Sequence, residues 1–370
     1  FQLRRNPMAI NDVYPEQYQS QLDEKAERLS TQFNAFNAPQ LDIFPSATSH
    51  YRMRAEFKIW HEDQSANYAM YEPGEYKRPF IIEQFPVGNR YINELMPKVL
   101  AAVNEDALLS RRLFQIEFLT TLTNEAVLSL IYHRPLCDEW EQRAQKLSES
   151  LGVSIIGRSR KQKRVIGKDF VTETLSVNGA SYRYQQVETG FTQPNAHVCE
   201  SMLSWAQTHC LPLQGDLLEL YCGNGNFTVP LSKCFDKVLA TEISKTSVNS
   251  ALYNFKLNDI KNAAVVRMSS EEFSEAMDGV RSFRRLKDID LTSYNFSTIF
   301  VDPPRAGLDA HTTDIVKRFE NILYVSCNPD TLAHNLESIC ETHTIEKFAL
   351  FDQFPYTHHV ECGVLLRRKA

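Results

Sequence analysis

Hydrophobic and polar positions follow helical and strand-like spacings in turn along the first half of the chain. Residues 15–36 place Leu22, Ala26 and Leu29 on one face, which predicts an N-terminal helix. Residues 50–86 contain short alternating runs broken by a turn at 72–74, which predicts antiparallel strands. The other elements predicted for this half are helices over 90–103 and 137–150, two strands within 114–133 and a strand over 153–157.

After residue 190 the pattern changes to apolar strands that alternate with loops and helices. Strands are predicted over 217–222, 238–243, 264–268, 298–304 and 322–329, and helices over 245–257 and 330–341. This alternation predicts a doubly wound, mostly parallel sheet, which binds ligands at the carboxyl ends of its strands. The last two apolar segments, 344–351 and 360–367, are expected to form an antiparallel edge.

The length of 370 residues predicts two domains, at about 150 residues per domain. Residues 1–47 are interpreted as an N-terminal extension with a helix, in which 1–7 are a remnant of an expression vector. Residues 48–175 are expected to form an α+β module, and residues 176–370 the doubly wound α/β domain.

Composition excludes several classes of protein. Hydrophobic residues at 43% and charged residues at 23% are ordinary globular values. The longest apolar runs fall far short of the ~20 residues of a membrane-spanning helix, so a soluble, cytoplasmic protein without membrane contact is expected. The eight cysteines include no C-x2-C pair, which argues for reduced thiols and against a zinc or iron–sulfur site. No metal is expected.

The net charge of −6 argues against binding nucleic acid through a general positive field. A local patch can still contact phosphates, and residues 158–164 are the candidate. They contain Arg158, Arg160, Lys161, Lys163 and Arg164. A solvated loop is the alternative interpretation of this segment.

The turn after the first strand of the second half is suited to a nucleotide. Residues 221–227 place Gly223 and Gly225 where a backbone can approach a ligand closely. Glu242 ends the next strand, where an acidic side chain accepts the ribose hydroxyls of a bound nucleoside. A third glycine and a G-K-[ST] string are missing, which disfavours pyrophosphate and favours S-adenosylmethionine. Glu242 as a structural neighbour of a helix N-terminus is the alternative.

Two reactive groups lie at the ends of later strands and suit methylation of uracil. Cys327 ends a strand and opens a helix, a position that lowers a thiol pKa. Carbon 5 of uracil becomes nucleophilic when a thiolate adds to carbon 6, and a base must then remove the C5 proton. Cys327 and Glu361 are the candidates for these roles. Cys362 is assigned to packing, and His358 and His359 to structural or substrate-edge roles rather than proton transfer.

Several strings together resemble the RNA uracil-C5 methyltransferase family. They are FTQPN (191–195), LLELYCGNGNF (217–227), ATEI (240–243), FVDPPRAGLD (300–309), YVSCNP (324–329) and FDQFPYTHHVECG (351–363). The resemblance extends to SHYRMRAEFKIWH (49–61) and covers nearly all of the chain after Met8. It implies a Rossmann-like class I methyltransferase domain in the C-terminal half and an N-terminal α+β module that recognises RNA.

The resemblance also implies roles for individual residues. Cys327 matches the family's nucleophile and Glu361 its base. The donor contacts that carry over are Gln193, Tyr221, Asn226, Glu242 and Asp302, beside the turn at Gly223. The implied reaction is methylation of uridine 54 in the T-loop of tRNA, with S-adenosylmethionine as donor and without a metal or an iron–sulfur cluster.

Residues that could hold an opened RNA loop are aromatic or cationic. They are Phe191, Arg305, Lys58, Phe114 and His133, and for the last three a core or surface role is an equal alternative. The expected partners are the T-arm of tRNA and other RNAs with a T-arm-like hairpin. No obligate protein partner is evident.

Three other functions stay open on the sequence. The first is C5-uracil methylation of ribosomal RNA, although enzymes of that kind typically carry a cysteine-rich cluster motif, and residues 1–190 contain only Cys137. The second is an RNA-binding or tRNA-folding role with methylation secondary. The third is amino-group methylation through Asp302-Pro303-Pro304, which is weakened because Arg305 replaces the expected aromatic residue.

Overall fold

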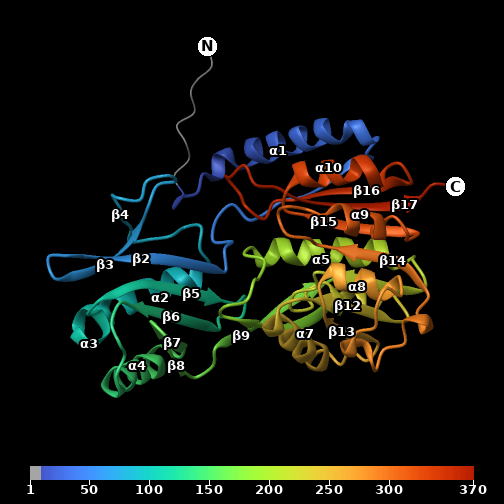
Figure 1. Ribbon diagram of the computed structural model, residues 1–370. Helices are drawn as coiled ribbons and strands as arrows, with labels where there is room; N and C mark the ends of the chain where they lie inside the picture. The colour runs from blue at the N-terminus through green and yellow to red at the C-terminus, as the bar shows by residue number, and fades with distance from the viewer. Residues whose placement is uncertain (1–9) are drawn as a thin grey trace, which may run out of the picture. The chain divides into compact units, whose positions relative to one another are not determined.

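The computed structural model describes residues 10–370, so the vector remnant expected at 1–7 lies outside the described residues. The chain divides into two compact units (Figure 1). Unit 1 contains Ala47–Glu173 and Gln186–Ala196 together with the residues up to Glu16. Unit 2 contains Gln17–Ser46, Thr174–Gln185 and His197–Ala370. The helix expected in a separate N-terminal extension is therefore part of the C-terminal unit.

Unit 1 is built on a seven-stranded sheet in the order β4-β3-β2-β5-β6-β7-β8. Its strands are β2 (Arg54–Glu62), β3 (Ser65–Met70), β4 (Phe80–Ile81), β5 (Leu113–Thr120), β6 (Ala126–Tyr132), β7 (Ser154–Ser159) and β8 (Gln162–Ile166). Neighbouring strands are antiparallel except β6 and β7, which are parallel because a helix connects them. This is the α+β module expected from the alternating pattern.

Three helices accompany this sheet: α2 (Arg90–Glu105), α3 (Ala107–Ser110) and α4 (Asp138–Leu151). The side chain of Asn89 caps α2 by accepting from the backbone N–H of Tyr91. Helix α2 buries an apolar stripe that includes Ile92, Met96 and Val99, which explains its packing against β3 and β5. Gly152 ends α4 in the left-handed conformation.

The basic segment 158–164 is a β-hairpin and not the loop expected from the sequence. Residues 158–159 end β7 and residues 162–164 begin β8, with Arg158 opposite Lys163. Lys161 has a φ of 59° in the tight turn between the strands. The expected strand over 153–157 is therefore longer, because the cations occupy ladder positions whose side chains alternate between the two faces.

Unit 2 contains an eight-stranded sheet in the order β1-β16-β17-β15-β14-β11-β12-β13. The strands are β1 (Leu41–Phe44), β11 (Asp216–Leu220), β12 (Val238–Glu242), β13 (Ala263–Arg267), β14 (Phe296–Val301), β15 (Asn321–Ser326), β16 (His343–Phe351) and β17 (Glu361–Arg368). All pairs are parallel except those of β17, which is antiparallel to both β15 and β16. The edge strand beside β16 and β17 is β1, parallel to β16, so the last two strands do not form the edge as expected.

Helices cover both faces of this sheet, as a doubly wound fold requires. They are α1 (Tyr18–Phe33), α5 (Ala196–Cys210), α6 (Thr228–Leu231), α7 (Lys245–Leu257), α8 (Ser270–Met277), α9 (Ala310–Val316) and α10 (Pro329–Ile339). Helices α1, α8, α9 and α10 share one apolar core with the strands. On the other face, Trp205 of α5 packs over Gly363 of β17, where a Cβ atom would lie 2.8 Å from its ring.

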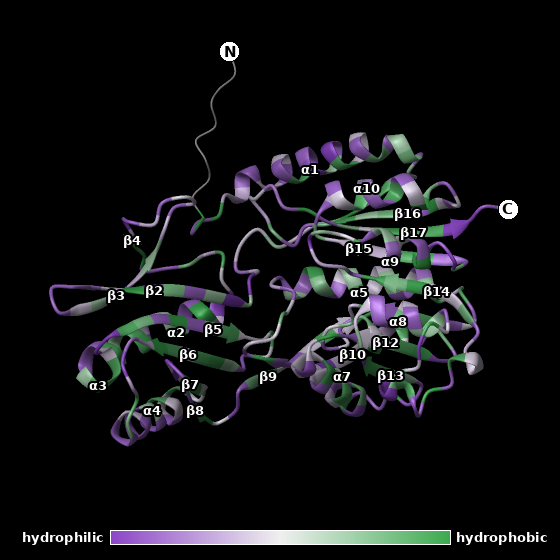
Figure 2. Cartoon of the chain, in the orientation of Figure 1, coloured by the Kyte–Doolittle hydropathy of each residue, from purple (hydrophilic) through white to green (hydrophobic). Residues whose placement is uncertain are grey.

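The hydropathy of the chain follows these layers. In Figure 2 the sheet strand β14 is coloured hydrophobic, whereas α1 alternates between hydrophilic and hydrophobic residues along its length. A further hairpin of β9 (Phe170–Val177) and β10 (Ala180–Val187), not predicted from the sequence, has residues in both units. The C-terminal unit thus has the expected Rossmann-like, doubly wound fold, extended at one edge by β1.

Candidate functional site

The register of β15 and β17 brings Cys327 and Glu361 to the same end of the sheet. Ser326 lies opposite Cys362 in this antiparallel pair. Cys327 comes directly after Ser326, at the end of β15. Glu361 comes directly before Cys362 and is the first residue of β17. Asp302 directly follows β14, whose last residue Val301 pairs with Tyr324 of β15. Three groups far apart in sequence therefore gather at the carboxyl end of the parallel strands.

The electrostatics at Cys327 differ from the sequence expectation. Burial, followed by the charges of Glu361 and Asp302, raises the pKa of this thiol to about 11. A backbone hydrogen bond and the Arg305 guanidinium act the other way, with smaller effect. The expectation of a lowered pKa at the helix N-terminus is therefore wrong for the protein alone, because desolvation and negative charge outweigh the helix.

The two carboxyl groups beside Cys327 are themselves strongly perturbed. Burial raises the pKa of Asp302 to about 7. Glu361 is 4% exposed, and burial followed by the charge of Asp302 raises its pKa well above the ordinary value. Within residues 10–370, its Oε2 atom has no hydrogen-bond partner. A buried carboxyl oxygen without a partner is costly in a folded protein and is typical of a group that meets a ligand.

The glycine-containing turn and Glu242 form one hydrogen-bonded unit. Gly223 has a φ of 55°, and a Cβ added there would meet no atom within 4 Å, so its backbone faces open space. Its N–H donates to Oε2 of Glu242 at 2.9 Å. The N–H groups of Ile243 and Ser244 donate to Oε1, each at 2.9 Å. The carboxylate is thus fixed by the backbone beside an accessible turn.

Two further residues predicted to contact the methyl donor lie in the same turn. Tyr221 adopts a φ of 57°, unusual for a residue with a side chain, and its hydroxyl is 3.2 Å from the hydroxyl of Ser270. Asn226 donates from its amide to Sγ of Cys199 at 3.4 Å. The structure therefore brings Tyr221, Gly223, Asn226 and Glu242 together in unit 2.

Gln193 and Phe191 belong to the segment of unit 1 that follows β10. Gln193 has a buried Oε1 atom that accepts no hydrogen bond from any described residue. Phe191 is 78% exposed, which is exceptional for a phenylalanine side chain. Both are thus available for a ligand, although they belong to unit 1, whereas Cys327, Glu361 and the turn at 221–227 belong to unit 2.

Three predicted RNA contacts of unit 1 form a single stack. The rings of Phe114 and His133 are 4.1 Å apart and nearly parallel. The ammonium group of Lys58 lies 4.3 Å from the centre of the Phe114 ring and donates to Gln115. Such a column of a cation and two flat rings is partly exposed and can accept the face of a base.

Arg305 is exposed near the reactive groups of unit 2. Its Nη1 atom lies 3.5 Å from Nδ1 of His359, and its carbonyl oxygen accepts from the side chains of Asn328 and Thr331. Burial lowers the pKa of His359, as do the neighbouring His358 and Arg305 charges. The His359 imidazole thus stands beside a permanent cation, which disfavours its protonation.

Most cations of the basic hairpin are paired within the protein. Arg158 bonds with Glu188, Lys163 with Asp169 at 2.9 Å, and Arg164 with both Asp138 and Glu141. Arg160 and Lys161 are exposed at the turn, and no ion pair to another described residue is recorded for them. The positive charge available to phosphates is therefore smaller than the sequence indicates.

Two buried carboxyl groups were missed by the sequence analysis. Glu219 on β11 accepts from the Thr228 hydroxyl at 2.6 Å, and burial raises its pKa to about 8. Asp352 follows β16 and accepts three side-chain hydrogen bonds from α1. A single acidic residue inside an apolar strand was the available signal for Glu219, whereas the partners of Asp352 lie more than 300 residues away in the sequence.

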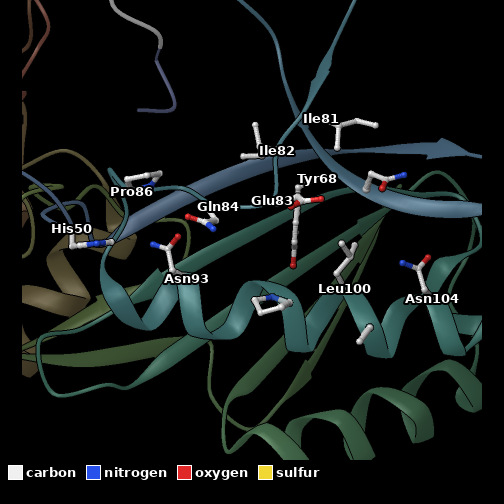
Figure 3. A pocket seen from close by; sticks show the side chains of 13 residues that line it. His50, Tyr68, Ile81, Ile82, Glu83, Gln84, Pro86, Asn93, Leu100 and Asn104 are labelled. Atoms are coloured by element: carbon white, nitrogen blue, oxygen red, sulfur yellow. The ribbon is translucent and has the colours of Figure 1, made fainter. Parts of the chain in front are cut away.

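Unit 1 also contains a hollow of about 760 Å³ (Figure 3). Pro86 and Ile82 lie on one side of it and α2 residues such as Asn93 and Leu100 on the other. None of the site residues predicted from the sequence lines this hollow. Among residues 10–370 no group of three or more His, Cys, Asp or Glu side chains is placed to hold a metal ion. None of the described helices is long and apolar enough to cross a membrane.

Comparison with known proteins agrees with this arrangement. A family model described as tRNA (uracil-5-)-methyltransferase matches residues 17–369. A tRNA/tmRNA (uracil-C(5))-methyltransferase of Saccharophagus degradans is 60% identical over 97% of this chain and 99% of its own length. A protein of Vibrio parahaemolyticus with the same name is 53% identical over 98% of this chain and 100% of its own length.

A solved structure supports the fold. The tRNA (uracil-54, C5)-methyltransferase of Pyrococcus abyssi, in complex with S-adenosyl-L-homocysteine, superposes with a TM-score of 0.72 at 20% identity. The match covers 94% of this chain and 83% of that one. The family match, together with relatives of nearly equal length, leads to one conclusion: the chain belongs to the tRNA (uracil-5-)-methyltransferase family.

Proposed function

We propose that the protein transfers a methyl group from S-adenosylmethionine to carbon 5 of uridine 54 in the T-loop of tRNA, through a covalent adduct with Cys327. The observation that carries this proposal is the gathering of Cys327, Glu361 and Asp302 at one end of the sheet. A thiol beside a buried carboxyl group is the pair that C5 methylation of a pyrimidine requires. The substrates tRNA and tmRNA appear in the names of the relatives.

The residues of the turn fit an adenosine-containing donor. Glu242 offers a fixed carboxylate to the ribose, and the open backbone at Gly223 allows close approach. Tyr221 and Asn226 belong to the same turn, and Asp302 supplies negative charge for a cationic donor. Gln193 joins this set through the family resemblance and its unpartnered amide oxygen. S-adenosylmethionine supplies a methyl group on a positively charged sulfur.

The chain's own groups then have defined tasks. The Cys327 thiolate forms a bond to carbon 6 of uracil, and the electron pair of the C5–C6 double bond moves toward the C4 carbonyl oxygen. After carbon 5 has accepted the methyl group, Glu361 removes the proton from carbon 5. The electrons of that C–H bond restore the double bond and expel Sγ of Cys327, which leaves the enzyme ready for another cycle.

The RNA would be held by aromatic and cationic side chains. Lys58, Phe114 and His133 form a stack that suits an unstacked base, and Phe191 is an exposed aromatic residue. Arg305 stands beside the reactive end of unit 2. A base must leave its loop to reach Cys327, which costs less in a loop than in a helix.

The test is methyl transfer from donor labelled on the methyl group to unmodified transcripts. Label is expected in tRNA and tmRNA, and in tRNA it should map to uridine 54. A tRNA with cytidine at position 54 is the matched control and should accept no label. Methylation of that control, or of a ribosomal RNA fragment in preference to tRNA, would overturn the proposed substrate.

A further inference from the structure

Helix α1 presents four polar side chains on one face toward the segment between β16 and β17. Tyr18, Gln21, Lys25 and Arg28 are spaced three or four residues apart, so they lie in one row. Each forms a hydrogen bond to the segment 352–358. That segment leads directly to Glu361, the first residue of β17.

The centre of this contact is the carboxylate of Asp352. It accepts from the Tyr18 hydroxyl at 2.8 Å, from the Gln21 amide at 2.8 Å and from the Lys25 ammonium at 2.7 Å. The side chains of Lys25 and Asp352 are 4% and 0% exposed. A buried ion pair must be fully hydrogen-bonded to be tolerated, and a fully satisfied one holds its neighbours in a single arrangement.

The remaining bonds continue along the segment toward Glu361. Lys25 also donates to the carbonyl oxygen of Phe354 at 2.9 Å. Gln21 accepts from the backbone N–H of Tyr356 at 3.2 Å. Arg28 donates to the carbonyl oxygen of His358 at 2.7 Å. The helix therefore holds alternate residues from Asp352 to His358.

Glu361 depends on such support because few hydrogen bonds hold its own side chain in place. In the described part of the chain its Oε2 atom accepts no hydrogen bond. Its position is set by the backbone of β17 and by the segment that enters this strand. A base that must remove one particular proton needs neighbouring residues that hold it in the correct position.

We propose that the Tyr18, Gln21, Lys25 and Arg28 face of α1 positions Glu361 for removal of the C5 proton. Lys25 and Arg28 are positioning residues, since they act through the 352–358 segment and touch no reacting atom. This inference rests on the proposed function, in which Glu361 acts only after Cys327 has bonded to carbon 6 and the methyl group has been transferred.

The order of the steps gives a specific signature. If Glu361 is displaced, the adduct still forms and accepts the methyl group, but its resolution slows and it accumulates. If α1 merely stabilises the fold, loss of its contacts reduces the folded fraction, and adduct and turnover fall together. The ratio of covalent adduct to turnover therefore separates the two roles.

The experiment compares Lys25→Met, Arg28→Ala and the control Gln19→Ala in the full-length protein. Gln19 is an exposed residue of α1 whose side-chain amide donates to Asp23 of the same helix. Turnover is followed as tritium released from carbon 5 of tRNA uridine, and adduct is measured on denaturing gels. Lys25→Met should lower kcat about tenfold or more and raise the adduct-to-turnover ratio by a similar factor. Arg28→Ala should change both about threefold, and Gln19→Ala neither.

Adduct and turnover that fall in proportion, or remain unchanged, in Arg28→Ala would overturn the inference. Because Arg28 is exposed, this variant decides the question even if Lys25→Met fails to fold. Wild type and Glu361→Gln serve as references. If Glu361→Gln traps no adduct, the proposed function fails and this inference with it. If Glu361→Gln traps adduct and the α1 variants do not, only this inference fails.

Discussion

At the scale of single residues, the protein holds its predicted nucleophile in a protonated form. Burial and two neighbouring carboxylates raise the pKa of Cys327 to about 11. A thiol in that state reacts slowly with electrophiles at neutral pH. The positive charge of a methyl donor bound nearby would offset these carboxylates and lower the pKa of the thiol.

This charge balance predicts the pH dependence of thiol alkylation. Asp302 has a pKa of about 7, so it is negatively charged above pH 8 and disfavours the thiolate of Cys327. Removal of this negative charge lowers the thiol pKa, so the iodoacetamide alkylation profile of Asp302→Asn should shift to lower pH than that of wild type. Cys327→Ala is the control for alkylation at other thiols. An unshifted profile would show that Asp302 does not act on Cys327.

Glu242 makes a separate prediction for donor binding. Its carboxylate is held by three backbone N–H groups and is proposed to accept ribose hydroxyls. Hydrogen bonds to charged groups contribute about 1.5–3 kcal/mol, so Glu242→Ala should weaken donor affinity at least about tenfold in calorimetry. Glu242→Gln keeps an acceptor oxygen and should lose less. Affinity for tRNA should stay unchanged, and an unaltered donor affinity would leave Glu242 a purely structural role.

At the scale of elements, local patterns predicted most of the fold. The alternation of apolar strands and helices after residue 190 gave the doubly wound sheet, and the helix at 15–36 lies where expected. Strand β1 was not predicted, because four residues are too few to show an alternating pattern. It pairs with β16, about 300 residues later in the chain. The hairpin β7–β8 was not predicted, because its run of cations is typical of a solvent-exposed loop and not of paired strands.

The positions of three candidate residues at strand ends were predictable from the sequence, and their roles stay predictions. Cys327, Glu361 and Glu242 stand at strand ends that the sequence displays directly. The raised pKa of Cys327 was not predictable, because it depends on carboxylates that only the folded sheet brings near. The pairing of Arg158 with Glu188 is likewise a tertiary contact. The number of cations in a sequence segment therefore overstates the positive charge that is free to contact RNA phosphates.

The hairpin yields a prediction about RNA affinity. Arg160 and Lys161 are the exposed cations at its turn, while Arg158 and Arg164 are engaged by carboxylates. If this hairpin contacts phosphates, Arg160→Gln with Lys161→Gln should weaken tRNA binding and reduce its salt slope by up to about 0.9 for each lost contact. Lys261→Gln, which removes an exposed cation paired with Asp259 in unit 2, is the control. A salt slope equal to that of wild type would make the hairpin turn an ordinary solvated surface.

At the scale of the whole molecule, both units are discontinuous in sequence. Helix α1 precedes most of unit 1 in the chain but belongs to unit 2, and the chain returns to unit 1 over residues 186–196, up to the first residue of α5. The family match extends over residues 17–369 and includes all of these segments. The predicted catalytic residues, most of the predicted methyl-donor contacts and α1 all belong to unit 2, whereas the aromatic stack proposed to bind RNA belongs to unit 1.

The account depends most on the covalent bond between Cys327 and the uracil of the substrate. The most direct measurement is mass spectrometry of the complex trapped by Glu361→Gln with unmodified tRNA and S-adenosylmethionine, after digestion of both protein and RNA. We predict a single cross-linked species in which the peptide containing Cys327 carries uridine 54 with one added methyl group. An unmodified Cys327 peptide, or a cross-link at another residue, would contradict the account.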